Sequence, residues 1–159
     1  ITELSNILRS SLSAEKAETV PLQQELKIVK DYLALESMRF EDRLRVNFGI
    51  DEKTLANPVP PMMLQTLVEN AIKHGISKQM KGGVIKIVSD VKENQHLLLV
   101  QNTGHLNGYA KHGGGFGLAS TKDRLHLLYG DKASFDIRQV AETLVEARVL
   151  MPISDGKTR

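Results

Sequence analysis

The chain has 159 residues, of which 41% are hydrophobic and 25% are charged. This is the composition of an ordinary globular domain, and it excludes a disordered or fibrous chain. The net charge is only +2 and aromatic residues make up 4%, which argues against a nucleic-acid-binding protein. The absence of cysteine excludes disulfides and thiolate metal sites, and no apolar run is long enough to cross a bilayer.

The first part of the chain is predicted to be mainly helical. Apolar residues at helical spacing predict helices over 1–14 and 21–40, the second beginning at Pro21, where a missing N–H costs nothing. Alternating residues predict a strand over 45–50. Three prolines within 57–61 predict an extended connection between this strand and the next helix.

The second part is predicted to be a mixture of helices and paired strands. In chain order we expect a helix over 62–75, strands over 84–91 and 96–100, an irregular glycine-rich segment over 101–117, a helix over 118–129, and strands over 134–140 and 143–152. This order favours an α/β two-layer sandwich: a mixed, mostly antiparallel sheet of about five strands with helices on one face, plus N-terminal helices.

The first candidate site segment is LVENAIKHG, within the predicted helix 62–75. Asn70 carries an amide oxygen that can join the ligand shell of a Mg²⁺ ion otherwise held by phosphate oxygens and water. Lys73, one turn later, can meet the phosphates. Taken alone, the same residues also fit the polar rim of a helix.

The second segment, VQNTG, directly follows a predicted strand. Asn102 can accept a hydrogen bond from the amino group of an adenine, and Gly104 leaves room for the base. Taken alone, the segment also fits an ordinary turn that begins at an asparagine.

The third segment, HGGGFGLASTKDRL, is a glycine-rich loop that leads into a helix. Glycines permit close approach of the backbone, and free N–H groups at a helix start favour phosphate. The segment matches neither the P-loop pattern nor the dinucleotide-binding pattern. A glycine cluster by itself is weak evidence for a nucleotide.

In this order and spacing, the three segments resemble the boxes of the GHKL ATP-binding fold, also called the Bergerat fold, of gyrase, Hsp90, histidine kinases and MutL. The N-box corresponds to residues 69–74, the first glycine box to 102–104 and the second to 113–118.

The resemblance narrows to the LytS-type sensor histidine kinases and covers about residues 1–153. It is carried by PPMMLQTLVENAIKHGI, by GFGLASTKDRLHLLYGDKASF, and by two upstream stretches, LSNILRSSL and LQQELKIVKDYLALESMRFEDRL. It implies the ATP- and Mg²⁺-binding catalytic portion of a bacterial two-component kinase. It also implies transfer of the γ-phosphate to a histidine upstream of Ile1, and relay to a response regulator of the LytTR type.

The family pattern also implies a domain organisation. We expect residues 1–40 to be the C-terminal part of the dimerisation and phosphoacceptor helix region, residues 41–153 the catalytic domain, and residues 154–159 a flexible tail. The full-length protein would be a homodimer and an inner-membrane sensor, with this portion in the cytoplasm. No nucleic acid is expected as a partner.

The resemblance assigns a role to each site residue. Asn70 would ligate Mg²⁺, Lys73 and His74 would hold phosphates, Asn102 would read adenine, and Glu69 would orient or deprotonate the incoming histidine. The remaining nucleotide-binding positions are Gly104, Gly113, Gly115, Phe116, Gly117 and Leu118.

Three positions depart from the patterns of related proteins. Asn102 stands where the family usually has Asp, and Ser120 where it usually has Asn. Thr66 stands where gyrase-like ATPases carry the glutamate that activates water, which favours transfer to a protein acceptor over hydrolysis. Two alternatives stay open: a catalytically degenerate GHKL nucleotide-binding module, and a serine kinase of the anti-sigma type.

Overall fold

Within residues 19–106 and 115–153, which the computed structural model describes, five strands form one mixed sheet in the order β2–β4–β5–β7–β6. The strands are β2 (Leu44–Ile50), β4 (Gly83–Lys92), β5 (Gln95–Thr103), β6 (Ser134–Ala141) and β7 (Leu144–Pro152). β2 is parallel to β4, and the other neighbours are antiparallel.

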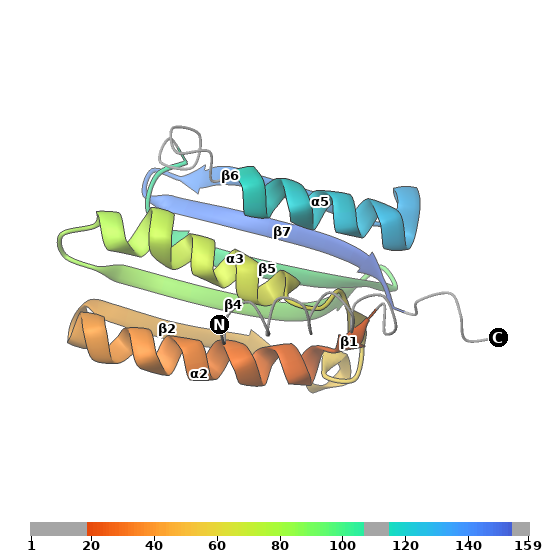
Figure 1. Ribbon diagram of the computed structural model, residues 1–159, viewed down its shortest axis with the longest axis horizontal. Helices are drawn as coiled ribbons and strands as arrows, with labels where there is room; N and C mark the ends of the chain where they lie inside the picture. Colours follow the sequence, from red (N-terminus) through yellow and green to blue (C-terminus); the bar gives the residue numbers. More distant parts are fainter. Residues whose placement is uncertain (1–18, 107–114, 154–159) are drawn as a thin grey trace, which may run out of the picture.

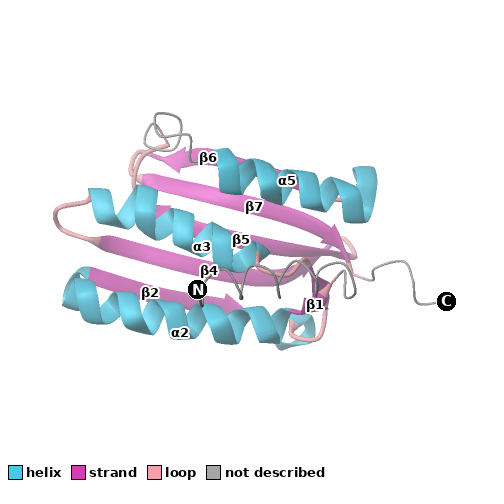
Figure 2. Ribbon diagram, viewed as in Figure 1, coloured by secondary structure: helices cyan, strands magenta, loops and turns pink. Residues whose placement is uncertain are grey.

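The α-helices of the described residues cover one face of this sheet, as Figures 1 and 2 show. They are α2 (Leu22–Phe40), α3 (Met63–Asn70) and α5 (Gly115–Tyr129). The predicted two-layer α/β sandwich with a mixed, mostly antiparallel five-stranded sheet is therefore confirmed.

The core lies between the helices and the sheet and is one continuous apolar cluster. Alternate residues of β5 and β7 are buried, because successive side chains of a strand point to opposite faces. α2 belongs to the same core, to which it contributes Leu22, Leu26, Val29, Leu33 and Phe40. Each such side chain contributes about 2 kcal/mol by its removal from water.

The start of α2 differs slightly from the sequence prediction. Pro21 is not the first helical residue; it is extended, with φ −64° and ψ 143°, and precedes the helix. With Val20 it forms the short strand β1 (Val20–Pro21), which pairs with β3 (Pro58–Val59) inside the predicted extended connection. The first free N–H groups of α2 donate to the start of this connection and to the turn before it, from Leu22 to Asn57 O at 2.9 Å and from Gln23 to Leu55 O at 2.9 Å.

The start of α3 is capped by another helix. Its preceding residue, Met62, has φ 67° and provides no side-chain cap. The buried carboxyl of Glu25, on α2, lies there instead: burial raises its pKa, while the N–H groups of Met62, Gln65 and Leu64 act to lower it. α2 therefore fixes the N-terminal end of α3 through a side chain as well as through apolar packing.

Three boundaries differ from the prediction near the expected site. The helix over 62–75 ends in a π-helical turn, Ala71–Gly75, and α5 begins at Gly115 rather than at 118. β5 continues to Thr103, so Asn102 lies within a strand and not in an irregular segment. The predicted helix over 1–14 and the predicted tail over 154–159 lie outside the described residues.

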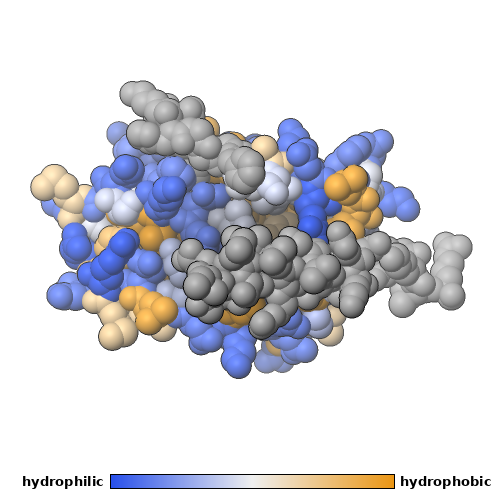
Figure 3. Space-filling view, in the orientation of Figure 1, coloured by the Kyte–Doolittle hydropathy of each residue, from blue (hydrophilic) through white to orange (hydrophobic). Residues whose placement is uncertain are grey.

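Figure 3 shows that the face with the helices is largely hydrophilic, with separate hydrophobic patches. The most exposed large apolar side chains are Leu35, Met38, Met80 and Leu127. Among the described residues, no helix has both the length and the hydropathy needed to cross a membrane.

Candidate functional site

The end of the π-helical turn meets the end of β5 at very short range. A Cβ atom on Gly75 would lie 2.0 Å from Asn102 Nδ2, and one on Gly104 would lie 3.1 Å from Gly75 Cα. Gly104 also has φ 152°, in the region that favours glycine. The structure therefore brings the end of the predicted N-box helix and the first glycine box into direct contact.

Asn102 occupies the centre of this contact. Its side chain is on the helix-covered face of β5, is 2% exposed, and donates from Nδ2 to Thr103 O at 3.0 Å. It is paired with Ile85 of β4 on one side and Val145 of β7 on the other, and both are fully buried. Asn102 is thus a polar group on an otherwise apolar floor, which is the setting in which an amide can select a base by hydrogen bonding.

The second glycine box meets α3 near Asn70. A Cβ atom on Gly117, in the first turn of α5, would lie 3.1 Å from Thr66 Cγ2 and 3.3 Å from Asn70 Nδ2. Asn70 Nδ2 is buried and has no hydrogen-bond partner among the described residues. A buried amide nitrogen without a partner lowers the stability of a folded protein. Its presence here supports a bound ligand that accepts a hydrogen bond from it.

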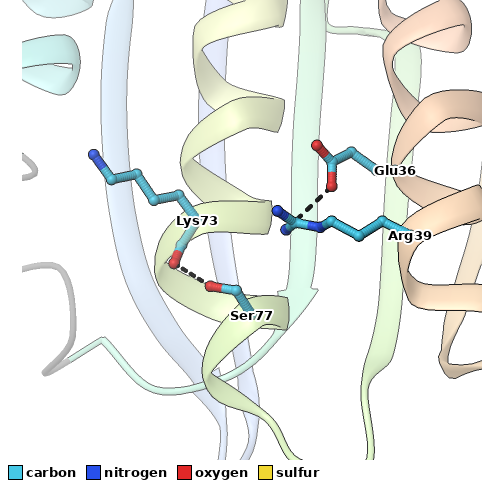
Figure 4. A network of polar contacts seen from close by, with 4 residues as sticks. All are labelled: Glu36, Arg39, Lys73 and Ser77. Carbon is cyan, nitrogen blue, oxygen red and sulfur yellow. Dashed lines mark hydrogen bonds and ion pairs between the residues drawn. The ribbon is translucent and has the colours of Figure 1, made fainter.

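The two residues expected to hold phosphates differ in exposure. Lys73 is exposed, and Figure 4 shows its side chain leaving the π-helical turn after α3 on the side away from Glu36 and Arg39 of α2. Its backbone carbonyl accepts a hydrogen bond from Ser77 Oγ, which supports the turn at this point. His74 is only 5% exposed. Lys73 is therefore placed to meet a solvent-borne anion, whereas His74 is mainly enclosed by protein.

Glu69 lies on the side of α3 that faces α2. Its carboxylate accepts a hydrogen bond from Gln65 Nε2 at 3.1 Å. Burial, together with the negative charges of Glu36 and Glu69, raises the pKa of Tyr32 on α2 to about 12. Glu36 also pairs with Arg39 at 3.2 Å (Figure 4). Glu69 is therefore part of a charged group between α2 and α3, separate from the contact between Asn70 and Gly117.

A cavity of about 290 Å³ extends from this contact between the N-terminal part of α3 and α5. It is lined by Pro60, Pro61, Met62, Met63, Thr66, Gly117, Ser120, Thr121 and Arg124. Arg124 supplies a positive charge beside the polar side chains of Ser120 and Thr121, while the α3 side of the cavity is mainly apolar.

The described residues contain no group of three or more His, Cys, Asp or Glu side chains placed to hold a metal ion. A Mg²⁺ ion at Asn70 would thus need most of its oxygen ligands from a bound phosphate and from water, which is the usual way that proteins hold Mg²⁺ with nucleotides.

The other predicted positions divide into three groups. Leu118 is half-buried and packs against the core. Gly115 and Phe116 begin α5, and Gly113 lies outside the described residues. The sequence interpretation missed Gln139 of β6, whose side chain binds the backbone after the first glycine box. Since an isolated glutamine near a hairpin has no motif, no sequence signal marked it.

Comparisons with known proteins show which proteins this chain resembles. A model of the histidine kinase family matches residues 1–44. The sensor protein LytS of Staphylococcus haemolyticus is 32% identical over 158 residues, which cover 91% of this chain and 27% of that protein. The sensor histidine kinase/phosphatase LytS of Staphylococcus aureus is 35% identical over 130 residues, covering 80% of this chain and 20% of that protein. The chain thus spans about a quarter of the length of these relatives.

A solved structure shares the fold. The histidine kinase domain of the blue-light activated histidine kinase from Erythrobacter litoralis EL346 superimposes with a TM-score of 0.63. It is 20% identical, and the match covers 87% of this chain and 64% of that one. At this identity the similarity establishes the fold of the described sheet and helices.

Proposed function

The chain belongs to the LytS-type sensor histidine kinases, and we propose that it is the portion of such a kinase that binds ATP with Mg²⁺ and transfers the γ-phosphate to a histidine. The observation that carries the proposal is the pair of glycine contacts around α3. Gly75 lies against Asn102, and Gly117 lies against Asn70. Three segments distant in sequence are thereby brought into contact around α3 and the turn that ends it.

Each side chain has a distinct part in binding. Asn102 accepts a hydrogen bond from the adenine amino group, and Asn70 supplies an amide oxygen to Mg²⁺. Lys73 is exposed beside them and neutralises phosphate charge. The bound Mg²⁺ supplies charge neutralisation at the phosphates. Since phosphoryl transfer needs mainly positioning and charge stabilisation, these residues provide the kind of chemistry it requires.

Glu69 acts on the acceptor rather than on ATP. Its exposed carboxylate lies on the α2-facing side of α3, next to Gln65 and Tyr32. From there it orients or deprotonates a histidine that approaches along α2. The acceptor histidine belongs to a part of the protein upstream of Ile1.

The similarity to sensor kinases supports a proposal for the cellular setting. The phosphoryl group passes from the histidine to a response regulator of the LytTR type, and the whole protein is a homodimeric inner-membrane sensor with this portion in the cytoplasm. The relatives are sensor kinases, of which this chain matches about a quarter.

Calorimetry with ATP, with Mg²⁺ or with EDTA, tests the proposal. We expect micromolar to millimolar binding that Mg²⁺ strengthens. Asn70→Ala weakens binding about tenfold with Mg²⁺, because it removes a metal ligand, and has little effect in EDTA. Asn47→Ala, on an exposed position of β2, is the matched control and leaves both values unchanged.

Two results would contradict the proposal. Failure of the wild-type chain to bind ATP would exclude a nucleotide site. Equal Mg²⁺ dependence in wild type and Asn70→Ala would exclude the metal role of Asn70.

A further inference from the structure

The side chain of Gln139, on the edge strand β6, makes hydrogen bonds to the backbone at the end of the first glycine box and just after it. The N–H of Leu106 donates to Gln139 Oε1 at 2.7 Å. Gln139 Nε2 donates to Gly104 O at 3.1 Å. One amide thus holds both a donor and an acceptor of the same short backbone segment, as a neighbouring strand would.

The same amide also binds its own hairpin. Nε2 lies 2.8 Å from Ala141 O, and 3.3 Å from the carbonyl oxygens of Glu142 and Leu144. Because the amide nitrogen carries two hydrogens, the short contacts to Ala141 O and Gly104 O use both of them. Gln139 therefore joins the β6–β7 hairpin to the segment after β5.

Two backbone features make this arrangement possible. The pairing of β6 with β7 is irregular between Gln139 and Ala141, which leaves hairpin carbonyls free to turn toward the side chain. The N–H of Gly104 also donates to Thr143 O at 2.9 Å. Gly104 is thus held to the hairpin through its N–H directly and through its carbonyl by way of Gln139.

The sheet register places this link beside the candidate adenine position. Asn102 is paired with Val145, and Val145 is paired with Gln139. Their side chains lie in one row, and two strand spacings separate Asn102 from Gln139 by about 10 Å. Gln139 itself is exposed, so its truncation opens no space in the core.

We infer that Gln139 is a positioning residue for adenine recognition: its amide fixes the backbone of Gly104 and Leu106, which closely follows Asn102 along the chain. The inference rests on the proposed function. Since both ends of its amide are used by the backbone, Gln139 acts on the nucleotide through that backbone and not by direct contact.

The test compares Gln139→Met with Gln101→Met. Methionine keeps the length of the side chain and removes its hydrogen bonds. Gln101 is the matched control because its side chain bonds to Glu146, at 2.8 Å, on the opposite face of the sheet and not to the backbone near Gly104. Hydrogen exchange of the Leu106 amide, followed by NMR, reports the link, and calorimetry with ATP·Mg²⁺ and GTP·Mg²⁺ reports recognition of the base.

We expect rapid exchange at Leu106 in Gln139→Met, while the amides of β5 stay protected. Affinity for ATP falls about fivefold, the effect of one or two lost positioning bonds, and affinity for GTP changes less. The melting temperature stays within about 4 °C of wild type, because the side chain is exposed. Gln139→Glu, whose carboxylate faces the same carbonyl oxygens, loses at least as much affinity.

Several outcomes would overturn the inference. Unchanged ATP affinity in Gln139→Met, or wild-type behaviour of Gln139→Glu, would show that the link does not serve the nucleotide. A Gln139→Met protein that fails to fold, or an equal loss in Gln101→Met, would show a general structural role. If the wild-type chain binds no ATP, the proposed function fails as well; if it binds ATP and Gln139→Met binds equally, only this inference fails.

Discussion

β5 carries two buried polar side chains on the same face, and the two ends of the strand use them differently. His96 is 0% exposed and Asn102 is 2% exposed. Six residues separate them, or about 20 Å along the strand. His96 lies in a chain of hydrogen-bonded side chains, and Asn102 lies where backbone segments approach so closely that only glycine fits.

At the His96 end the polar groups form a continuous chain. His96 Nε2 lies 2.7 Å from Ser89 Oγ, which donates to Thr54 Oγ1 at 2.7 Å. Thr54 Oγ1 donates to Asp51 O at 2.6 Å. Since the Ser89 hydrogen is used toward Thr54, His96 is assigned as the Nε2–H donor. The chain attaches the 51–54 turn to the sheet, and we attribute it to stability.

At the Asn102 end the polar groups lie against glycine-containing backbone. Asn70 Nδ2 is buried with no partner among the described residues, and Gly75, Gly104 and Gly117 allow the surrounding segments to pack closely. His96 Nδ1 is likewise buried with no partner among the described residues, so an unpartnered polar atom does not by itself distinguish the two ends. The difference lies in the backbone: side chains join the His96 end to a neighbouring turn, whereas glycines bring three segments of the candidate site together at the Asn102 end.

The largest expected effect comes from adding one carbon at the glycine-lined end. A Cβ on Gly75 would lie 2.0 Å from Asn102 Nδ2 and 3.1 Å from Thr103 O, and the second of these is backbone. We expect Gly75→Ala to lower the free energy of unfolding by at least about 3 kcal/mol, because the turn must separate from β5. Urea unfolding and ATP calorimetry measure the two consequences, and binding should be lost.

Gly49→Ala provides the control for this substitution. A Cβ there would have only an ordinary contact, 3.8 Å from Val88 Cγ2, so stability should change little. Wild-type stability in Gly75→Ala would mean that the turn and β5 can separate freely, and the contrast between the two ends would then be lost.

Much of this architecture could be predicted from the sequence, for physical reasons that particular elements show. Alternation marks β2, a short apolar run marks β5, and apolar spacing marks α2 and α3, because the buried faces of strands and helices impose these patterns. The end of β5 was misplaced because Asn102, Thr103 and Gly104 look like a turn, although the strand ladder continues to Thr103.

The contacts between distant segments could not be predicted in the same way. The side chain of Gln139 binds backbone atoms of Gly104 and Leu106, which every residue has. The residue types at positions 104 and 106 therefore do not reveal these hydrogen bonds. The link from His96 to Thr54 also depends on tertiary placement. The order of the three boxes along the chain is a family pattern and can be recognised in the sequence. Their contacts with one another are visible only in the folded structure.

The next effect concerns the pH dependence at the His96 end. Burial lowers the pKa of His96 from 6.5 to about 4. Between about pH 6.5 and pH 4, His96 is protonated in the unfolded chain but neutral in the folded chain. The free energy of unfolding therefore falls as the pH falls through this range. Between pH 7 and 5 the loss is about 2 kcal/mol.

Urea unfolding across this range provides the measurement. His96→Gln should flatten the profile, because glutamine does not titrate, even if it is less stable at pH 7. His126→Gln, at an exposed position of α5, should keep the wild-type slope. An unchanged slope in His96→Gln would assign the pH dependence to other groups.

The smallest expected effect is at Asn102, where a carboxylate replaces the amide. Asn102→Asp loses the hydrogen bond from Nδ2 to Thr103 O, 3.0 Å long, and places an oxygen against that carbonyl. We expect the free energy of unfolding without nucleotide to fall by about 1 kcal/mol. A carboxylate is a stronger acceptor for the adenine amino group, so ATP affinity should rise about fivefold while GTP gains nothing. Calorimetry with both nucleotides and urea unfolding separate the two effects.

An equal gain for GTP would place base recognition elsewhere. A loss of stability without any gain in ATP affinity would make Asn102 the same kind of residue as His96, a polar group that serves the fold alone.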